Sequence, residues 1–102
     1  MLSIKEVAQG YAAVGSEARL SVLSLLVQAG DDGLTVSEIG HQLGIAASTL
    51  AHHLRYLATA NMILQEKQGR EVRNTANYDH IEELGNYLLL ECCKNSIKNI
   101  VR

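Results

Sequence analysis

The sequence predicts a mainly α-helical fold that carries one small β-hairpin. Most of the chain repeats apolar residues at helical spacing, whereas the segment after Met62 alternates apolar and polar residues as strands do. Proline is absent, so no predicted helix is interrupted by a residue without a backbone N–H. Leu, Ile, Val and Ala must build the core, because the chain contains neither Trp nor Phe.

The chain of 102 residues has the length of one domain, and we expect residues 1–102 to form a single one. Its apolar runs are too short to span a bilayer, and its first residues lack the apolar core of a signal peptide. We therefore expect a soluble, cytoplasmic protein without a membrane partner. No phosphate loop, nucleotide fingerprint or nucleophile motif is present, which argues against an enzyme.

Two helices are predicted before the first turn-rich segment. The first covers about residues 4–14, and Gly15 ends it. The second begins after Ser16, a good N-cap residue, and ends at Gly30. Residues 31–33 then form a turn. We expect the buried face of the second helix to carry Leu20, Leu23, Leu26 and Val27.

The next two helices follow each other closely. Thr35 and Glu38 have the spacing of a capping box, which predicts a short helix that ends at Gly44. A longer helix covers about residues 46–60, and its buried face carries Leu50, Leu54 and Leu57. A short helix, a turn that contains glycine and a longer helix form the helix-turn-helix pattern.

The rest of the chain predicts a hairpin and a closing helix. Residues 63–66 and 71–75 are predicted strands around a turn at residues 67–70. The closing helix starts near Asp79 and places Ile81, Leu84, Leu88 and Cys92 on one stripe. Gly85 lowers the helix propensity there, which predicts a close approach of another helix, as at a dimer interface. Together these elements predict a winged helix-turn-helix fold.

The charge distribution favours a nucleic-acid partner although the formal net charge is −2. Residues 41–73 hold four basic and two acidic side chains, so this segment carries +2 and the remainder −4. A positive segment can meet phosphates, and contacts to phosphates position a protein without reading the base sequence. We expect phosphate contacts from Arg55, Lys67, Arg70 and Arg73.

The longer helix also carries residue types that read base edges. With its leucines in the core, its exposed positions hold Ser48, Thr49, Ala51, His52 and Tyr56. Small and polar groups let a helix enter the major groove, where Ser, Thr and His can hydrogen-bond to bases. For any single residue, an ordinary solvated position explains the pattern equally well. The combination with a basic hairpin favours DNA binding.

These segments together resemble the ArsR/SmtB family of metal- and stress-responsive repressors. The resemblance runs through residues 18–23, 35–39, 48–54, 69–70 and 76–78. It implies a homodimeric repressor that joins through its first and last helices and binds an inverted-repeat DNA operator. It also implies that Ala47, Ser48, Ala51 and His52 face DNA, with Lys67 and Arg70 near the DNA backbone. The full predicted DNA-binding set adds Thr49, His53, Arg55, Tyr56 and Arg73.

Two metal sites that are frequent in that family are not supported by this sequence. The short helix has no thiol in residues 34–39, where the family can carry a Cys-x-Cys pair. In the closing helix His80 directly follows Asp79 and no later His is present, so the family's zinc-type pattern is missing. We expect no required cofactor.

The adjacent Cys92 and Cys93 are the remaining candidate sensor. They resemble the adjacent-cysteine ending of arsenite-responsive members, and thiolates suit arsenite or antimonite as an inducer. Arsenite favours three thiolates in that family, so a third would come from the other subunit or from a small thiol. Packing of Cys92 as a small hydrophobe, thiol redox sensing and a pure protein-interaction module are the open alternatives.

Overall fold

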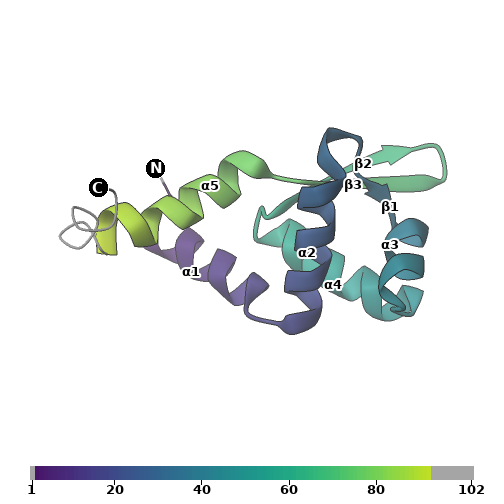
Figure 1. The fold of residues 1–102 in the computed structure, drawn as a ribbon, viewed down its shortest axis with the longest axis horizontal. Helices are drawn as coiled ribbons and strands as arrows, with labels where there is room; N and C mark the ends of the chain where they lie inside the picture. The colour runs from purple at the N-terminus through teal and green to yellow at the C-terminus, as the bar shows by residue number, and fades with distance from the viewer. Residues whose placement is uncertain (1, 93–102) are drawn as a thin grey trace.

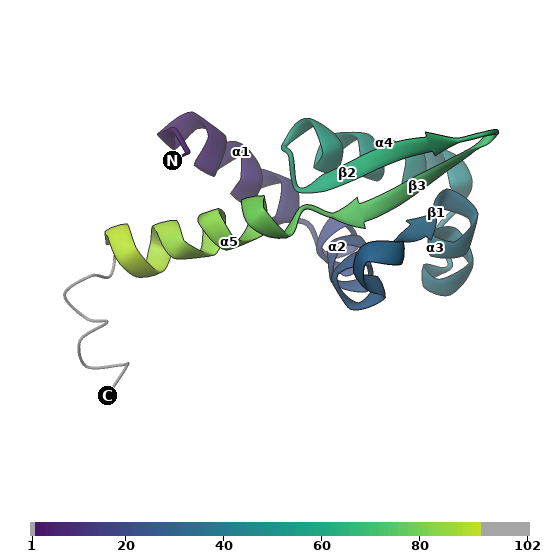
Figure 2. The same cartoon turned by 90° about the horizontal axis from the view of Figure 1, so that it is seen from above.

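The computed structural model describes residues 2–92, without the side chain of Cys92. The molecule has three regions along its length (Figure 1). α1 and α5 lie side by side at one end, a helical core occupies the middle, and a hairpin projects at the other end (Figures 1 and 2). The elements are α1 (Ile4–Val14), α2 (Glu17–Ala29), the 3₁₀-helix η1 (Gly30–Asp32), β1 (Leu34–Thr35), α3 (Val36–Leu43), α4 (Ala47–Thr59), β2 (Ile63–Gln68), β3 (Glu71–Ala76), α5 (Tyr78–Asn86) and the π-helix η2 (Tyr87–Cys92).

This architecture confirms the predicted winged helix-turn-helix fold. The short α3 and the longer α4 form the helix-turn-helix, and β2 and β3 form the wing. β3 lies between β1 and β2 in an antiparallel sheet of three strands. No helix within residues 2–92 is long and apolar enough to cross a membrane.

Local capping explains where the helices begin. The backbone N–H of Thr35 donates to Glu38 Oε1 at 2.8 Å, and the N–H of Glu38 donates to Thr35 Oγ1 at 3.2 Å. These bonds form the predicted capping box of α3. Hydrogen bonding of the Glu38 carboxylate to the backbone N–H and the side chain of Thr35 holds the pKa of Glu38 below its ordinary value. Ser3 and Glu6 form a second capping box at α1. Gly44 ends α3 in the left-handed region, at a φ of 66°.

The core sits where α2, α3 and α4 meet. Leu50, Leu54 and Leu57 of α4 are fully buried, as predicted, together with Ile39 of α3 and Leu26 of α2. The spacing of the three leucines places them on one face of α4, so their burial also sets which face remains exposed.

The buried face of α2 differs from the prediction. Leu23 and Leu26 are buried, but Leu20 and Val27 are exposed and Val22 takes their place in the core. At 100° per residue, Leu20 and Val27 lie roughly 100° from the middle of the buried stripe. The predicted face was therefore rotated toward solvent, because apolar residues occur on more than one side of α2.

The wing is longer and its turn is tighter than predicted. The strands pair from Ile63 opposite Ala76 to Gln68 opposite Glu71, which leaves a turn of two residues. Gly69 opens this turn at a φ of 64°, and Arg70 has no positive φ, as in a type II′ turn. The prediction therefore placed both strands correctly but ended them too early, at residues 66 and 75, and made the turn too long, at residues 67–70.

The closing helix starts where it was predicted, within one residue. α5 begins at Tyr78, next to Asp79, and Asn77 caps it. Of the predicted stripe, Leu84 is buried, whereas Leu88 is exposed. A Cβ on Gly85 would meet nothing within 4 Å in the described part of the chain, so the close approach predicted there at a dimer interface stays a prediction. Within the protomer, a close approach occurs at Gly10 of α1, where a Cβ would lie 2.8 Å from the methyl groups of Leu84.

A buried polar cluster joins the wing to the helix-turn-helix. Asn74 is fully buried; its side-chain amide donates to the carbonyls of Leu34 and Val72 at 3.2 and 3.3 Å, and its oxygen accepts from Gln65 Nε2 at 2.8 Å. Gly33 allows this approach, because a Cβ there would lie 2.2 Å from the backbone oxygen of Asn74. A buried amide with its bonds satisfied specifies one register of β1 on β3.

We expect Gly33→Ala to lower the free energy of unfolding by about 4 kcal/mol, because it adds overlap to an unfavourable backbone conformation. Gly30→Ala is the matched control. Gly30 has φ 73° and ψ −156°, close to the 61° and −166° of Gly33, but nothing lies within 4 Å of its Cβ position. Its loss should be about 2 kcal/mol. Urea unfolding measures both, and equal losses would contradict the close approach.

Candidate nucleic-acid interface

The exposed face of α4 carries most of the predicted base-reading residues. α4 begins directly after the turn that follows Gly44, and burial of its leucines turns the opposite side outward. The residues on this outward side are Ala47, Ser48, Thr49, Ala51, His52, Arg55 and Tyr56. The structure therefore brings seven of the predicted residues onto one helix surface.

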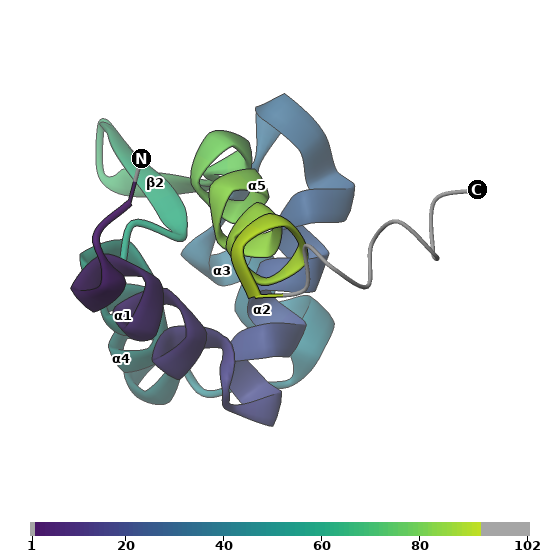
Figure 3. The ribbon, with the colours of Figure 1, turned by 90° about the vertical axis from the view of Figure 1, so that its left-hand side faces the viewer.

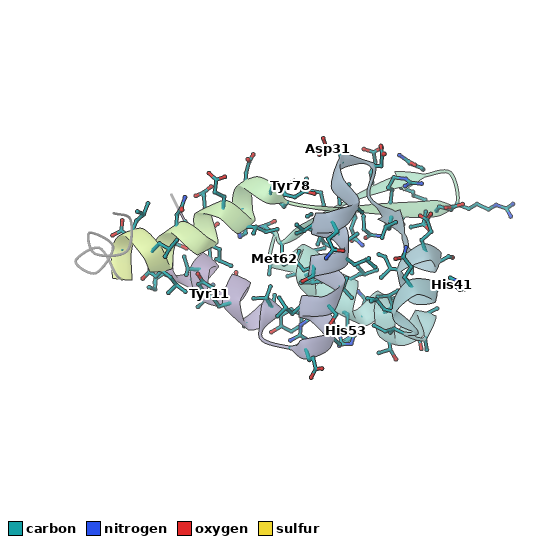
Figure 4. All side chains as sticks on the ribbon, viewed as in Figure 1. Tyr11, Asp31, His41, His53, Met62 and Tyr78 are labelled. Carbon is teal, nitrogen blue, oxygen red and sulfur yellow. The ribbon has the colours of Figure 1, made fainter. Side chains whose placement is uncertain are left out.

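His53 lies apart from that surface. It is half-buried and flanks the leucine stripe, and its Nδ1 is buried with no hydrogen-bond partner among the described residues (Figure 4). A buried, unpaired ring nitrogen is unfavourable unless a further group supplies a bond. His53 is thus oriented differently from His52, although the two are adjacent in the sequence.

Arg19 positions Tyr56 on α4. Its guanidinium carbon lies 4.0 Å from the centre of the Tyr56 ring, within the range of a cation–π contact. The same side chain donates from Nε to the carbonyl of Ala13 at 2.7 Å and from Nη2 to that of Ala12 at 3.4 Å. One arginine of α2 therefore joins the end of α1 to the face of α4. No local pattern marks Arg19 for this role, because all its partners belong to other elements.

A pocket of about 390 Å³ opens between α1 and α4. α1 supplies Gln9 and Ala12, and the α4 side includes the predicted residues His52, Arg55 and Tyr56. Thr59 and Ala60 complete the lining. No sequence pattern predicts this pocket, since its two walls are about 40 residues apart in the chain and carry no shared motif. 

The basic residues of the wing are divided between its two faces. Directly opposed residues of two strands share a face, and neighbours along a strand alternate. Lys67 pairs with Val72, whereas Arg73 pairs with Glu66, so Lys67 and Arg73 lie on opposite faces. Lys67 and Arg70 are both exposed, and Arg70 lies in the turn at the tip of the wing.

Arg73 is bonded to the loop before β1. Its Nη1 donates to the carbonyls of Asp32 and Gly33 at 2.9 and 3.4 Å, and its Nε donates to Gln68 Oε1 at 3.2 Å. The structure thus places Arg73 as a tie between the wing and this loop. Its predicted phosphate contact would have to compete with these bonds.

The predicted thiol site lies outside the described residues. Cys92 is the last residue of η2, but its side chain and all of Cys93 fall beyond what the structure describes. Among the described residues, no three His, Cys, Asp or Glu side chains are grouped so that they could hold a metal ion.

Comparison with known proteins agrees with this geometry. A family model described as a helix-turn-helix domain matches residues 14–66, more than half of the chain, so the chain belongs to this helix-turn-helix family. The chain shares its fold with solved structures of transcriptional regulators. No curated protein sequence matches the chain significantly.

Solved structures then specify the type of fold. An ArsR-like transcriptional regulator from Rhodococcus sp. RHA1 is 24% identical, with a TM-score of 0.76 over 96% of this chain and 94% of that one. Reduced HlyU from Vibrio cholerae is 24% identical, with a TM-score of 0.67 over 86% and 90%. A homodimeric winged helix-turn-helix DNA-binding domain from Mycobacterium bovis, a possible ArsR-family regulator, is 19% identical, with a TM-score of 0.71 over 88% and 82%. The predicted resemblance to the ArsR type is confirmed for the fold.

We expect Arg19 and Tyr56 to be energetically coupled by about 0.5–1 kcal/mol in a double-mutant cycle with Arg19→Met and Tyr56→Leu. Chemical denaturation of the four proteins gives the coupling free energy. The same cycle with Lys67→Met in place of Tyr56→Leu should be additive, because Lys67 lies on the wing. Additivity of Arg19 with Tyr56 would show that the ring contact contributes nothing to stability.

Proposed function

We propose that this chain is a sequence-specific transcriptional repressor whose α4 enters the major groove of DNA. The observation that carries the proposal is the one-sided burial of α4, which exposes small and hydrogen-bonding side chains along its first two turns. Ser48, Thr49 and His52 are suited to base edges, and Ala47 and Ala51 allow a close approach. His53 was predicted as part of this set, but its half-burial favours a supporting role.

Phosphate contacts in this proposal come from α4 and from the wing. Arg55 is exposed on α4, and Lys67 and Arg70 are exposed on the hairpin. Each can approach a phosphate without breaking a bond to the described part of the chain. Arg73 would hold the wing in place through its bonds to the loop before β1. These contacts give affinity, while α4 gives specificity.

A homodimer supplies the second half of the interface. α1 and α5, which continues into η2, form one end of the molecule (Figure 3). Large apolar side chains are exposed on α1 and η2, namely Ile4, Leu88, Leu89 and Leu90. Several large apolar side chains exposed at one end of a molecule favour an interaction surface there. The Mycobacterium bovis domain with this fold is a homodimer. Twofold symmetry would place two copies of α4 in successive major grooves, about 34–36 Å apart, on an inverted repeat.

The proposal includes an inducer that is predicted from the sequence alone. Arsenite or antimonite would bind Cys92 and Cys93 and release the repressor from DNA. Cys92 ends η2, next to the exposed leucines, so a ligand there would act on the proposed dimer surface. A thiol redox response would act at the same place. Arsenite or antimonite, acting as an inducer, must bind the DNA-free form of the protein more tightly than the DNA-bound form.

We expect His52→Ala to weaken binding to the cognate operator by about 10- to 100-fold and to leave binding to random DNA nearly unchanged, because it removes a base contact. Lys67→Ala should weaken both and reduce the salt slope by about one per protomer. Fluorescence anisotropy with DNA from upstream of the protein's own gene measures these effects at several salt concentrations.

Glu82→Gln on α5 is the control for this series, because Glu82 is exposed and lies outside α4 and the wing. It should bind DNA like the wild-type protein. A His52→Ala variant that binds operator and random DNA as the wild type does would contradict base reading by α4. Binding that ignores salt would contradict the phosphate contacts.

We expect Leu89→Glu to shift the protein from dimer to monomer, because a carboxylate cannot be buried unpaired in an apolar interface. Leu20→Glu is a matched control: Leu20 is 49% exposed and Leu89 50% exposed, but Leu20 lies on α2. Sedimentation velocity at micromolar concentration distinguishes the two. If both variants remain dimeric, the interface does not include this surface.

A further inference from the structure

We infer that the pocket between α1 and α4 binds a small organic carboxylate with an apolar body, and that this ligand competes with DNA for α4. The second half of this inference rests on the proposed function, whereas the first half does not. The pocket has about 390 Å³, which lies within the range of 300–1,000 Å³ that is typical of small-molecule sites. It would hold an aromatic ring system that carries one acidic group.

The lining combines an apolar surface with a few polar groups. Ala12, Ala60 and the ring of Tyr56 supply apolar walls, and Gln9 and Thr59 add hydrogen-bonding groups from the two opposite sides. Mostly apolar walls with a few convergent polar groups are typical of ligand sites, because the walls contribute affinity and the polar groups fix orientation.

The charge of the lining selects an anion. Arg55 and His52 line the pocket, and no acidic side chain does. Arg55 has no ion pair or hydrogen bond within the described part of the chain, so its guanidinium donors are available. A guanidinium binds a carboxylate through two parallel hydrogen bonds, which an amide of the same shape cannot reproduce.

The aromatic wall is held in place before any ligand arrives. Arg19 covers one face of Tyr56 at 4.0 Å and is itself bonded to the carbonyls of Ala12 and Ala13. These contacts connect both walls of the pocket, because Ala12 belongs to α1 and Tyr56 to α4. A preformed wall lowers the ordering cost of binding.

The ligand and DNA would use the same side chains. His52, Arg55 and Tyr56 line the pocket and also lie on the exposed face of α4. A carboxylate on Arg55 removes that cation from a phosphate, and a ring beside His52 occupies the space next to a base contact. By linkage, DNA must weaken ligand binding by the same factor by which the ligand weakens DNA binding.

The test of the site uses 2-naphthoate and its neutral analogue 2-naphthamide in NMR titrations of the ¹⁵N-labelled full chain. We expect saturable shifts of the backbone signals of Gln9, Ala12, Arg55 and Thr59 with naphthoate, and binding at least tenfold weaker with the amide. Arg55→Ala should weaken naphthoate at least tenfold. Lys5→Ala removes a cation of α1 outside the lining and should leave the affinity for naphthoate unchanged.

Ala12→Leu is a second variant, which fills the pocket from α1 and should abolish binding of both compounds. Signal dispersion like that of the wild type verifies that each variant is folded. Equal affinity for acid and amide, shifts that do not saturate by 10 mM, or shifts centred on other residues would each overturn the site.

The competition is tested separately by anisotropy with operator DNA. We expect saturating naphthoate to weaken operator binding by at least tenfold in the wild type and to have no effect in Ala12→Leu. DNA binding that is unchanged by bound naphthoate overturns the competition. If no DNA binds under any condition, the proposed function and the competition both fail, and the NMR titration alone decides whether the carboxylate site exists.

Discussion

Burial of three leucines on one side of α4 is the constraint on which the remaining geometry depends. Leu50, Leu54 and Leu57 are spaced so that all three reach the core only in one rotation of the helix. Removing one such side chain typically costs about 2–5 kcal/mol, so other rotations are strongly disfavoured. The same rotation turns Ser48 and His52 outward. The rotation of α4 that buries the three leucines therefore determines both the stability of the core and the surface that faces outward, toward DNA in the proposed function.

Hydrogen bonds and a cation–π contact between segments distant in the sequence position the wing, α1 and α2 relative to α4. Hydrogen bonds from Arg73 and Asn74 join β3 to the loop before β1 and to β1 itself. Gly33 permits the close approach of this loop to the backbone of Asn74. On the other side of the molecule, Arg19 links the end of α1 to Tyr56. The wing is thus oriented by directional hydrogen bonds as well as by burial of Ile63 and Ala76 at its base, whereas the helices are held mainly by apolar burial.

α1 lies between α5 and α4 and contacts both. It packs against α5 through the Gly10 and Leu84 contact and through a hydrogen bond from the Tyr11 hydroxyl to the Leu84 carbonyl (Figure 4). It also lies beside α4 (Figure 3). There it forms one wall of the pocket. A change at the proposed dimer surface and a ligand in the pocket would therefore both act on α1. This gives a physical route by which either could alter the face of α4.

The sequence by itself determined the fold class, the capping box at Thr35, the buried leucines of α4 and the polar face opposite them. Each of these follows from residues within a few positions of one another, where helix geometry alone sets the neighbours. Only the tertiary structure decided that Arg73 bonds to a loop about 40 residues earlier and that His53 is half-buried. It also decided that Gly10 meets another helix within the protomer, whereas Gly85 does not, and that a pocket opens between α1 and α4. These features depend on distances between segments remote in the chain, and no local periodicity encodes such distances.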